Sequence, residues 1–293
     1  MAHPLHIVDV FAQEKYTGNQ LAVVPEADDL DTETMQRIAR EMNFSETTFI
    51  PSSEPTADGY RVRIFTPATE LPFAGHPTLG TARVIHRYIS ETKSETVVLD
   101  LDIGSIEVTI EPEDEEDHCW MRQKPPTFGP NLDRARVADI VGLAEDQLDS
   151  QYDPQIVSTG LQTLLVPLRS LDGVRAIQLS PEPFRRFVDE YETTAVFVFS
   201  SETVDERNDL HVRMFFDGIG ITEDPATGSS NGCLAAYLVE HEYFGNRVID
   251  MTVEQGYEID RPSTIGIRAD ASPSEIAVSV GGTVIPVARG ELL

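Results

Sequence analysis

Lysine, cysteine and long apolar runs are scarce in this sequence. Three of its 293 residues are lysine, whereas aspartate and glutamate together number 50, and the formal net charge is −28. A charge of this size repels nucleic acids and anionic membranes, so we expect neither as a partner. No apolar run reaches the ~18 residues that span a bilayer, and residues 1–10 lack the basic and apolar regions of a secretory signal. These absences predict a cytoplasmic protein.

The same scarcities indicate the environment of the protein. Acidic residues are spread through the chain and arginine replaces lysine, a pattern typical of proteins from a high-salt cytoplasm, where salt screens self-repulsion. An ordinary acidic mesophilic enzyme is the alternative. Cys119 and Cys233 belong to no CxxC motif or Cys/His cluster, so we expect free, buried thiols in a reducing compartment.

Motifs for a metal ion or a nucleotide are missing as well. His76 and His86 form no HxxxH pattern and have no neighbouring cysteine. Neither GxGxxG nor GxxxxGK[ST] occurs in the sequence. We therefore expect no metal and no cofactor.

Three segments of the first half recur, in the same order, in the second half. The similar pairs are TGNQLAVVP (17–25) with TGLQTLLVP (159–167), YRVRIFTP (60–67) with LHVRMFFD (210–217), and PFAGHPTLG (72–80) with DPATGSSNG (224–232). The repetition predicts a duplicated domain. We place the two domains at 1–124 and 125–293, with KPPTFGP (124–130) as the linker and the last strand free to return to the first domain.

Each half has the same predicted order of elements: two strands, an amphipathic helix, two strands, and a loop that opens a second helix. The predicted strands are 7–11, 21–24, 46–50 and 60–65 in the first half, and 155–158, 163–168, 195–199 and 211–215 in the second. Alternating strands close each half, with a turn expected at Gly104–Ser105. The predicted fold class is α+β: two similar domains, each a bent, mostly antiparallel sheet around a central helix.

Two loops that open helices contain the residues best suited to chemistry. Gly75 and Pro77 lie in AGHPTLGTA, and Gly228 lies in ATGSSNG, where Ser229 and Ser230 could cap the helix. A helix start presents unpaired N–H groups and a positive dipole end, and can bind a carboxylate. Helix capping alone is the alternative for either loop by itself. We expect the pair to face one cleft between the domains.

Three residues are candidates for proton transfer. His76 and Asp224 lie at the two loops, and histidine is a natural acid or base near neutral pH. Glu46 begins the apolar strand of NFSETTFI, and burial favours the protonated form of a carboxyl group, which suits a general acid/base. A solvated strand end is the alternative for Glu46.

Several segments together resemble the phenazine biosynthesis-like (PhzF-like) isomerase family. They are VDVFAQEKYTGNQLAVV, NFSETTFI, RIFTPATELPFAGHPTLGTA, EDPATGSSNGCLAAYL and EQGYEIDRPS, and the resemblance runs from residue 5 to about 280. It implies two domains of the diaminopimelate-epimerase-like fold with a cleft between them, no cofactor, and a possible homodimer.

The resemblance also implies roles for individual residues. Glu46 matches the acid/base glutamate of the family, His76 the motif histidine, Asp224 the motif aspartate and Ser229 the motif serine. Gly75 and Gly228 would offer backbone N–H groups to the substrate, and Asn19 would contribute to binding. One departure is Gln20, because the early motif of the family reads Gly-Asn-Pro; we expect an altered turn there. Ala74 and Ala226 take the places of the two cysteines of related racemases, which disfavours a two-thiol racemase.

The sequence therefore predicts an isomerase that moves a proton on a small carboxylic acid. Glu46 would take a proton from one carbon and return it at another, while Asp224 and His76 hold polar groups of the substrate. Two alternatives stay open: an epimerase that uses the same cleft, and a non-catalytic protein that binds a small carboxylate.

Overall fold

The computed structural model describes residues 2–112, 117–193, 195–216, 223–272 and 274–293. They form two compact units, one of Met1–Arg122 with Gly281–Leu293 and one of Gln123–Val280. The chain passes from the first unit to the second after Arg122, where the sequence predicted the change after Lys124. No helix among the described residues is long and apolar enough to cross a membrane.

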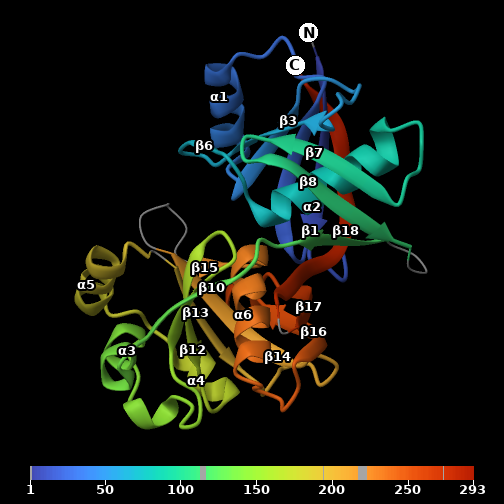
Figure 1. Ribbon diagram of the computed structural model, residues 1–293. Coiled ribbons are helices and arrows are strands. Elements are labelled where there is room, and N and C mark those ends of the chain that lie inside the picture. The colour runs from blue at the N-terminus through green and yellow to red at the C-terminus, as the bar shows by residue number, and fades with distance from the viewer. Residues whose placement is uncertain (1, 113–116, 194, 217–222, 273) are drawn as a thin grey trace. The chain divides into compact units, whose positions relative to one another are not determined.

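The first unit is a bent sheet with one central helix (Figure 1). Its elements are β1 (His3–Val10), β2 (Asn19–Pro25), α1 (Thr32–Met42), β3 (Glu46–Ile50), β4 (Tyr60–Arg61), β5 (Arg63–Phe65), β6 (Glu70–Leu71), α2 (Gly75–Val84), the π-helical turn η1 (Ile85–Ile89), β7 (Thr96–Leu101), β8 (Gly104–Glu111), β9 (His118–Arg122) and the later part of β18 (Ile276–Leu292).

Two ladders of strands surround helix α2 in this unit. One runs β6–β5–β3–β2–β1–β18 and the other β4–β7–β8–β9. β9 also pairs with β18, which joins the ladders. Helix α2 contacts strands of both ladders, and residues 76–84 of it are all buried. This buried helix, in contact with both ladders, is the central helix that the sequence predicted for the domain.

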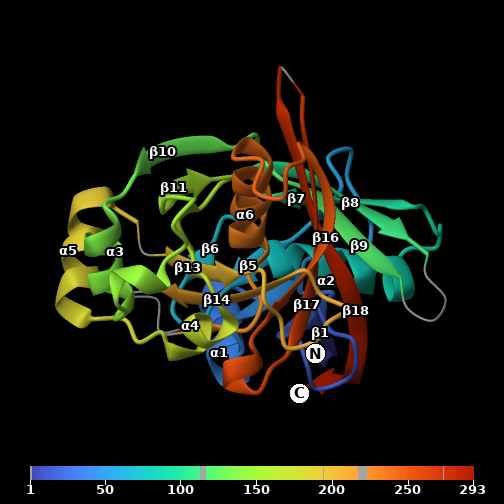
Figure 2. The same cartoon turned by 90° about the horizontal axis from the view of Figure 1, so that it is seen from below.

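The second unit repeats this design. Its elements are β10 (Thr127–Asn131), α3 (Arg134–Val141), η2 (Glu145–Gln147), β11 (Gln155–Ser158), β12 (Gln162–Pro167), α4 (Leu171–Ala176), α5 (Pro181–Tyr191), β13 (Ala195–Ser200), β14 (Leu210–Phe216), β15 (Glu223–Asp224), α6 (Gly228–Glu240), β16 (Val248–Gln255), η3 (Tyr257–Ile259) and β17 (Ser263–Ala271). Helix α6 contacts β11, β12, β16 and β17, and both views show it beside β16 and β17 (Figures 1 and 2).

Strand pairing confirms the duplication. The first unit has the antiparallel pairs β1–β2, β3–β5, β5–β6 and β7–β8 and the parallel pairs β2–β3 and β4–β7. The second has the antiparallel pairs β11–β12, β13–β14, β14–β15 and β16–β17 and the parallel pairs β12–β13 and β14–β16, in the same order. The α+β class with two similar domains is therefore confirmed.

A side-chain pair is repeated together with the strands. In the first unit Arg63 Nε and Nη2 donate to the two carboxylate oxygens of Glu70 at 2.7 and 2.8 Å, and the guanidinium lies 5.1 Å from the Phe65 ring centre. In the second unit Arg213 makes the same two bonds to Glu223 at 2.9 and 2.8 Å, over Phe215 at 4.8 Å. The repeated VRIF and VRMF segments thus produce the same forked ion pair.

Local sequence signals set several helix ends. Asp31 caps α1 by accepting a hydrogen bond from the Thr34 N–H, and Asn43 ends that helix with a φ of 56°. Met35 and Ala39 on its buried face pack with Phe49 and Phe65. Pro181 follows Ser180 at the start of α5, where its fixed φ suits the first helical turn.

Some predicted boundaries are wrong. The strand predicted over 60–65 divides at Val62, because β4 pairs with β7 whereas β5 pairs with β3. The predicted linker 124–130 is partly strand, since Thr127–Asn131 pairs with β11. The turn between β7 and β8 lies at residues 102–103, where Leu101 pairs with Gly104, and not at Gly104–Ser105.

Candidate active site

Two elements of the first unit bring Glu46 and His76 together. Glu46 is the first residue of β3 and pairs in register with Leu21 of the parallel strand β2. His76 is the second residue of α2, directly after Gly75. His76 Nε2 lies 3.4 Å from Glu46 Oε2. The sequence named both residues, but their contact depends on the packing of the start of α2 against the start of β3.

Burial determines the charge of His76. Its side chain is 6% exposed and that of Glu46 is 13% exposed. Burial lowers the pKa of His76 to about 3, and a hydrogen bond to the backbone of Gln20 only partly opposes this shift. The imidazole is therefore neutral at pH 7, and the pair is a carboxyl–imidazole contact without a positive charge.

The departure at Gln20 lies beside this contact. Asn19 is buried and begins β2, and Gln20 follows it within that strand with an exposed side chain. The expectation of an altered turn at Gln20 is therefore wrong, because the turn precedes the strand at Gly18, where φ is 68°. The backbone of Gln20 holds His76, so the residue that replaces proline contributes to the site through its main chain.

Asp224 occupies a similar loop in the second unit. It ends β15, is buried, and accepts a hydrogen bond from the hydroxyl of Thr227. Gly228 is the first residue of α6 and Ser229 the second. The expectation that Ser229 or Ser230 caps this helix is wrong, because both lie within its first turn. Thr227 is the cap residue, and its side chain bonds Asp224 in place of the helix N–H groups.

Residues 228–232, GSSNG, also match the GxSxG pattern of a hydrolase nucleophile, with Ser230 at the centre. Ser230 is fully buried, and its hydroxyl lies 3.1 Å from that of Thr163 on β12. A nucleophile elbow instead exposes its serine at a sharp turn between strand and helix. The structure therefore gives Ser230 a packing role.

Gln255 is a site neighbour that the sequence reasoning missed. This fully buried residue ends β16, and its side-chain amide hydrogen-bonds Asp224, Thr227 and Asn231. A signal was present, because EQGYEIDRPS is one of the segments that carry the family resemblance. Nothing in that segment shows that it contacts the Asp224 loop, because the contact joins β16 to the turn between β15 and α6.

The thiols take no part in these clusters. Cys119 and Cys233 are free and buried, as predicted. Burial raises the pKa of Cys119 to about 12 and also raises the pKa of Cys233. Both are therefore protonated at neutral pH. Among the described residues, no group of three or more His, Cys, Asp or Glu side chains is arranged to hold a metal ion.

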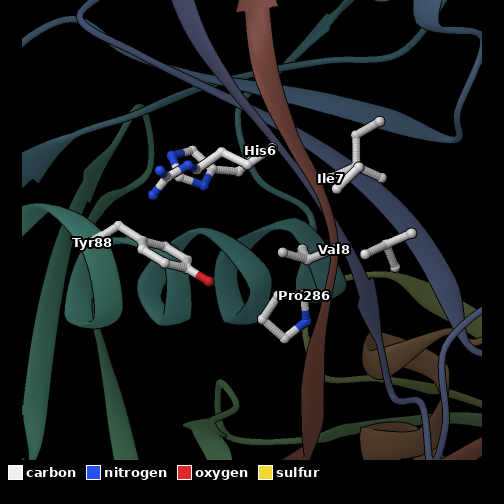
Figure 3. A pocket seen from close by; sticks show the side chains of 8 residues that line it. His6, Ile7, Val8, Tyr88 and Pro286 are labelled. Carbon is white, nitrogen blue, oxygen red and sulfur yellow. The ribbon is translucent and has the colours of Figure 1, made fainter.

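A pocket elsewhere in the first unit has a different lining. Its volume is about 190 Å³, and it lies where a bulge between Ile7 and Val8 shifts the β1–β18 register. Figure 3 shows the rings of His6 and Tyr88 on one side of the opening and Pro286 on the other. The two rings stack at 4.7 Å. Neither Glu46 nor His76 lines this pocket.

The predicted site residues thus form two groups. Asn19, Glu46, Gly75 and His76 belong to the first unit, and Asp224, Gly228 and Ser229 belong to the second. Gly75 and His76 begin the central helix of the first unit, and Gly228 and Ser229 begin that of the second. The expectation that both face one cleft stays a prediction.

Comparison with known proteins identifies the relatives of this chain. The family model described as "Phenazine biosynthesis-like protein" matches residues 8–290. A trans-2,3-dihydro-3-hydroxyanthranilate isomerase of Pseudomonas aeruginosa is 35% identical, over 98% of each chain. An uncharacterized isomerase of Pasteurella multocida is 34% identical, over 98% of this chain and 93% of the relative. A crystal structure of a PhzF-family phenazine biosynthesis protein from Bacillus anthracis has a TM-score of 0.90 and 29% identity, covering 100% of this chain and 99% of the other.

The duplicated fold and these relatives define an enzyme of the isomerase class. Within that class, the chain belongs to the phenazine biosynthesis-like protein family. The match covers both units, so the family assignment applies to the whole duplicated structure.

Proposed function

We propose that this isomerase moves a proton between two carbons of a small carboxylic acid without a cofactor, with Glu46 as the proton carrier. The carboxylate of Glu46 takes a proton as a C–H bond breaks, and the electron pair shifts the double bond. The same carboxyl group then returns the proton to a second carbon, so Glu46 ends the cycle unchanged. No oxidant or other reactant is needed.

The observation that carries this proposal is the contact between Glu46 and a neutral His76. A neutral imidazole 3.4 Å away orients the carboxyl group without fixing its charge, so Glu46 can hold or release a proton. A permanently charged neighbour such as arginine would favour the carboxylate throughout the cycle. The side chains are 6% and 13% exposed, which limits exchange of the carried proton with water.

The helix starts supply the complementary binding groups. Gly75 and His76 begin α2, and Gly228 and Ser229 begin α6, where backbone N–H groups have no partner within the helix. Such groups stabilise a substrate carboxylate and the negative charge that develops when a proton leaves carbon. Asp224 accepts a hydrogen bond from a substrate amine or hydroxyl, and Asn19 adds a polar contact. We propose that the residues at the two helix starts bind one substrate. We also propose that the enzyme is cytoplasmic and forms a homodimer.

The substrate of the Pseudomonas aeruginosa relative is the first compound to test. Trans-2,3-dihydro-3-hydroxyanthranilate has the carboxylate, amine and hydroxyl that these groups would bind. Purified enzyme should convert it in heavy water, with NMR recording a shifted double bond and only partial deuteration at the new C–H position, because burial of Glu46 limits exchange of the proton that it carries.

Other outcomes would favour the alternatives. Deuterium at a stereocentre without migration of the double bond would indicate an epimerase. Recovery of unchanged compound that nevertheless protects the protein against heating would indicate a binding protein. Turnover that is lost on treatment with EDTA or on dialysis would contradict a mechanism without a cofactor.

A further inference from the structure

We infer that Gln255 is a positioning residue that holds the Asp224 loop in its working conformation. The inference rests on the proposed role of Asp224. Gln255 belongs to β16, whereas Asp224 and Thr227 lie on either side of the turn between β15 and α6. One side chain therefore bridges both ends of the loop from a different strand.

The side-chain amide of Gln255 makes four hydrogen bonds, all with the Asp224 loop and the first turn of α6. Its Nε2 donates to the carbonyl of Asp224 at 2.8 Å and to Thr227 Oγ1 at 3.2 Å. Its Oε1 accepts from the Thr227 N–H at 3.2 Å and from Asn231 Nδ2 at 3.1 Å. The two donors and both acceptor positions of the amide are thus all engaged, with no exposure to water.

These bonds also determine that Thr227 is the donor, and Asp224 the acceptor, in the hydrogen bond between their side chains. Thr227 Oγ1 accepts a hydrogen from Gln255, so its single proton is free to be donated to Asp224 Oδ2. A hydroxyl that donates to a carboxylate favours the ionised form and fixes its orientation. Gln255 therefore acts on Asp224 through Thr227.

The flanking residues explain how Gln255 reaches the loop. Gly256 has a φ of 80°, and a Cβ there would lie 2.7 Å from the carbonyl oxygen of Pro225. Only glycine allows the chain to pass so close to the loop. On the opposite side of β16, Glu254 accepts bonds from His211 Nδ1 at 2.6 Å and from Asn208 at 2.7 Å, which fixes the end of the strand.

A matched pair of variants tests this inference. Gln255→Met keeps the shape of the side chain and removes its hydrogen bonds. Gln155→Met is the control, because Gln155 is also buried in the second unit and hydrogen-bonds Gly129 and His241, away from the loop. Both substitutions remove buried hydrogen bonds, so both should lower Tm by a few degrees.

Only Gln255→Met should change the loop. We expect it to lower kcat/KM on trans-2,3-dihydro-3-hydroxyanthranilate by about tenfold or more, and to accelerate hydrogen exchange of the Thr227 amide by about tenfold, as loss of its bonds to the loop predicts. Gln155→Met should leave both quantities within about twofold of wild type. Equal effects of the two variants, or unchanged Thr227 exchange in Gln255→Met, would overturn the inference.

Hydrogen exchange separates this inference from the proposed function. If wild-type enzyme does not convert the compound, the proposed substrate fails, and faster Thr227 exchange in Gln255→Met still supports the role of Gln255 in holding the loop. If wild-type enzyme is active and Gln255→Met retains its kcat/KM, the positioning role is wrong and the proposed function stands.

Discussion

The two units have the same framework but different carboxyl groups. Equivalent positions by strand register are Glu46 and Ala195, at the starts of β3 and β13, and Leu71 and Asp224, at the ends of β6 and β15. Each acidic residue of the proposed mechanism thus occurs in only one unit, and the equivalent position of the other unit holds an apolar residue. By contrast, the forked arginine–glutamate pairs occur twice. The repeated residues hold the sheet together, whereas the unrepeated ones lie where strands end and loops begin.

This difference teaches that the duplication supplies two similar scaffolds but not two copies of the same carboxyl group. A symmetric pair of bases, as in a two-base racemase, would place like groups at equivalent positions. Here Glu46 contacts a neutral histidine, and Asp224 accepts a hydrogen bond from Thr227. Two carboxyl groups in such different environments are suited to different tasks.

The largest expected effect would come from exchanging the two unrepeated carboxyl groups for amides. Glu46→Gln should lower turnover by about 10²–10⁴-fold and leave ligand affinity largely intact, because glutamine keeps the shape but cannot carry a proton. Asp224→Asn should weaken binding as well as rate. Calorimetry with the substrate and proton exchange by NMR in heavy water measure the two quantities. Near wild-type exchange in Glu46→Gln, with none in Asp224→Asn, would reverse the roles.

A smaller effect is expected from the repeated ion pairs, and it should appear in stability. Glu223→Gln should lower the free energy of unfolding by about 3 kcal/mol, because Arg213 is mostly buried and would lose its nearest carboxylate, keeping only the more distant Glu258 at 4.0 Å. Glu70→Gln should cost about 1 kcal/mol, because Arg63 and Glu70 are 22% and 29% exposed. Urea unfolding of both variants measures the difference. If Glu70→Gln proves the more damaging, burial does not distinguish the two pairs.

The smallest effect concerns the pH dependence of stability, at a position where the first unit has an arginine and the second a histidine. Arg61 pairs with Asp100 and Asp102 in the first unit, and the equivalent His211 bonds Glu254 and Glu258 in the second. Burial lowers the pKa of His211, but the hydrogen bonds to the two glutamates outweigh it and raise the pKa above 6.5. Protonated His211 therefore stabilises the fold fully below about pH 6.5, and this contribution is lost as pH rises through the folded-state pKa.

Unfolding in urea from pH 6 to pH 9 tests this. Wild-type protein should lose stability with a slope of at most about 1.4 kcal/mol per pH unit from this proton. The variant His211→Gln should be less stable at pH 6 and should lack that part of the slope. A wild-type curve that runs parallel to that of the variant would show that His211 does not titrate in this range.

Much of the framework follows from local signals in the sequence. The cap at Asp31, the end at Asn43 and the Ser180–Pro181 start are short-range effects, and the structure has all three. The repeated VRIF and VRMF segments also predicted the duplication. The division of the strand at Val62 could not be predicted, because it depends on which distant strands, β7 and β3, pair with each part.

The sequence named candidate site residues but could not give the contacts between them. Glu46 became a candidate because a glutamate at the head of an apolar strand is unusual, and His76 and Asp224 because they lie at the two loops that open helices; the family resemblance implies the same three residues. The neutral state of His76 was not foreseen, because it results from burial by residues far apart in the sequence. Gln255 was missed for a related reason, since its segment carried only the family resemblance and nothing in it showed the four hydrogen bonds to Asp224, Thr227 and Asn231.

The sequence by itself determined the class of fold, the duplication and the candidate residues, because hydrophobic periodicity, helix caps and repeated motifs act over a few residues. Only the tertiary structure decided that Glu46 meets His76, that Thr227 bonds Asp224 in place of capping α6, and that Gln255 holds the loop. These contacts join residues from separate strands and helices. Their geometry and charge depend on packing and burial, which a local pattern does not specify.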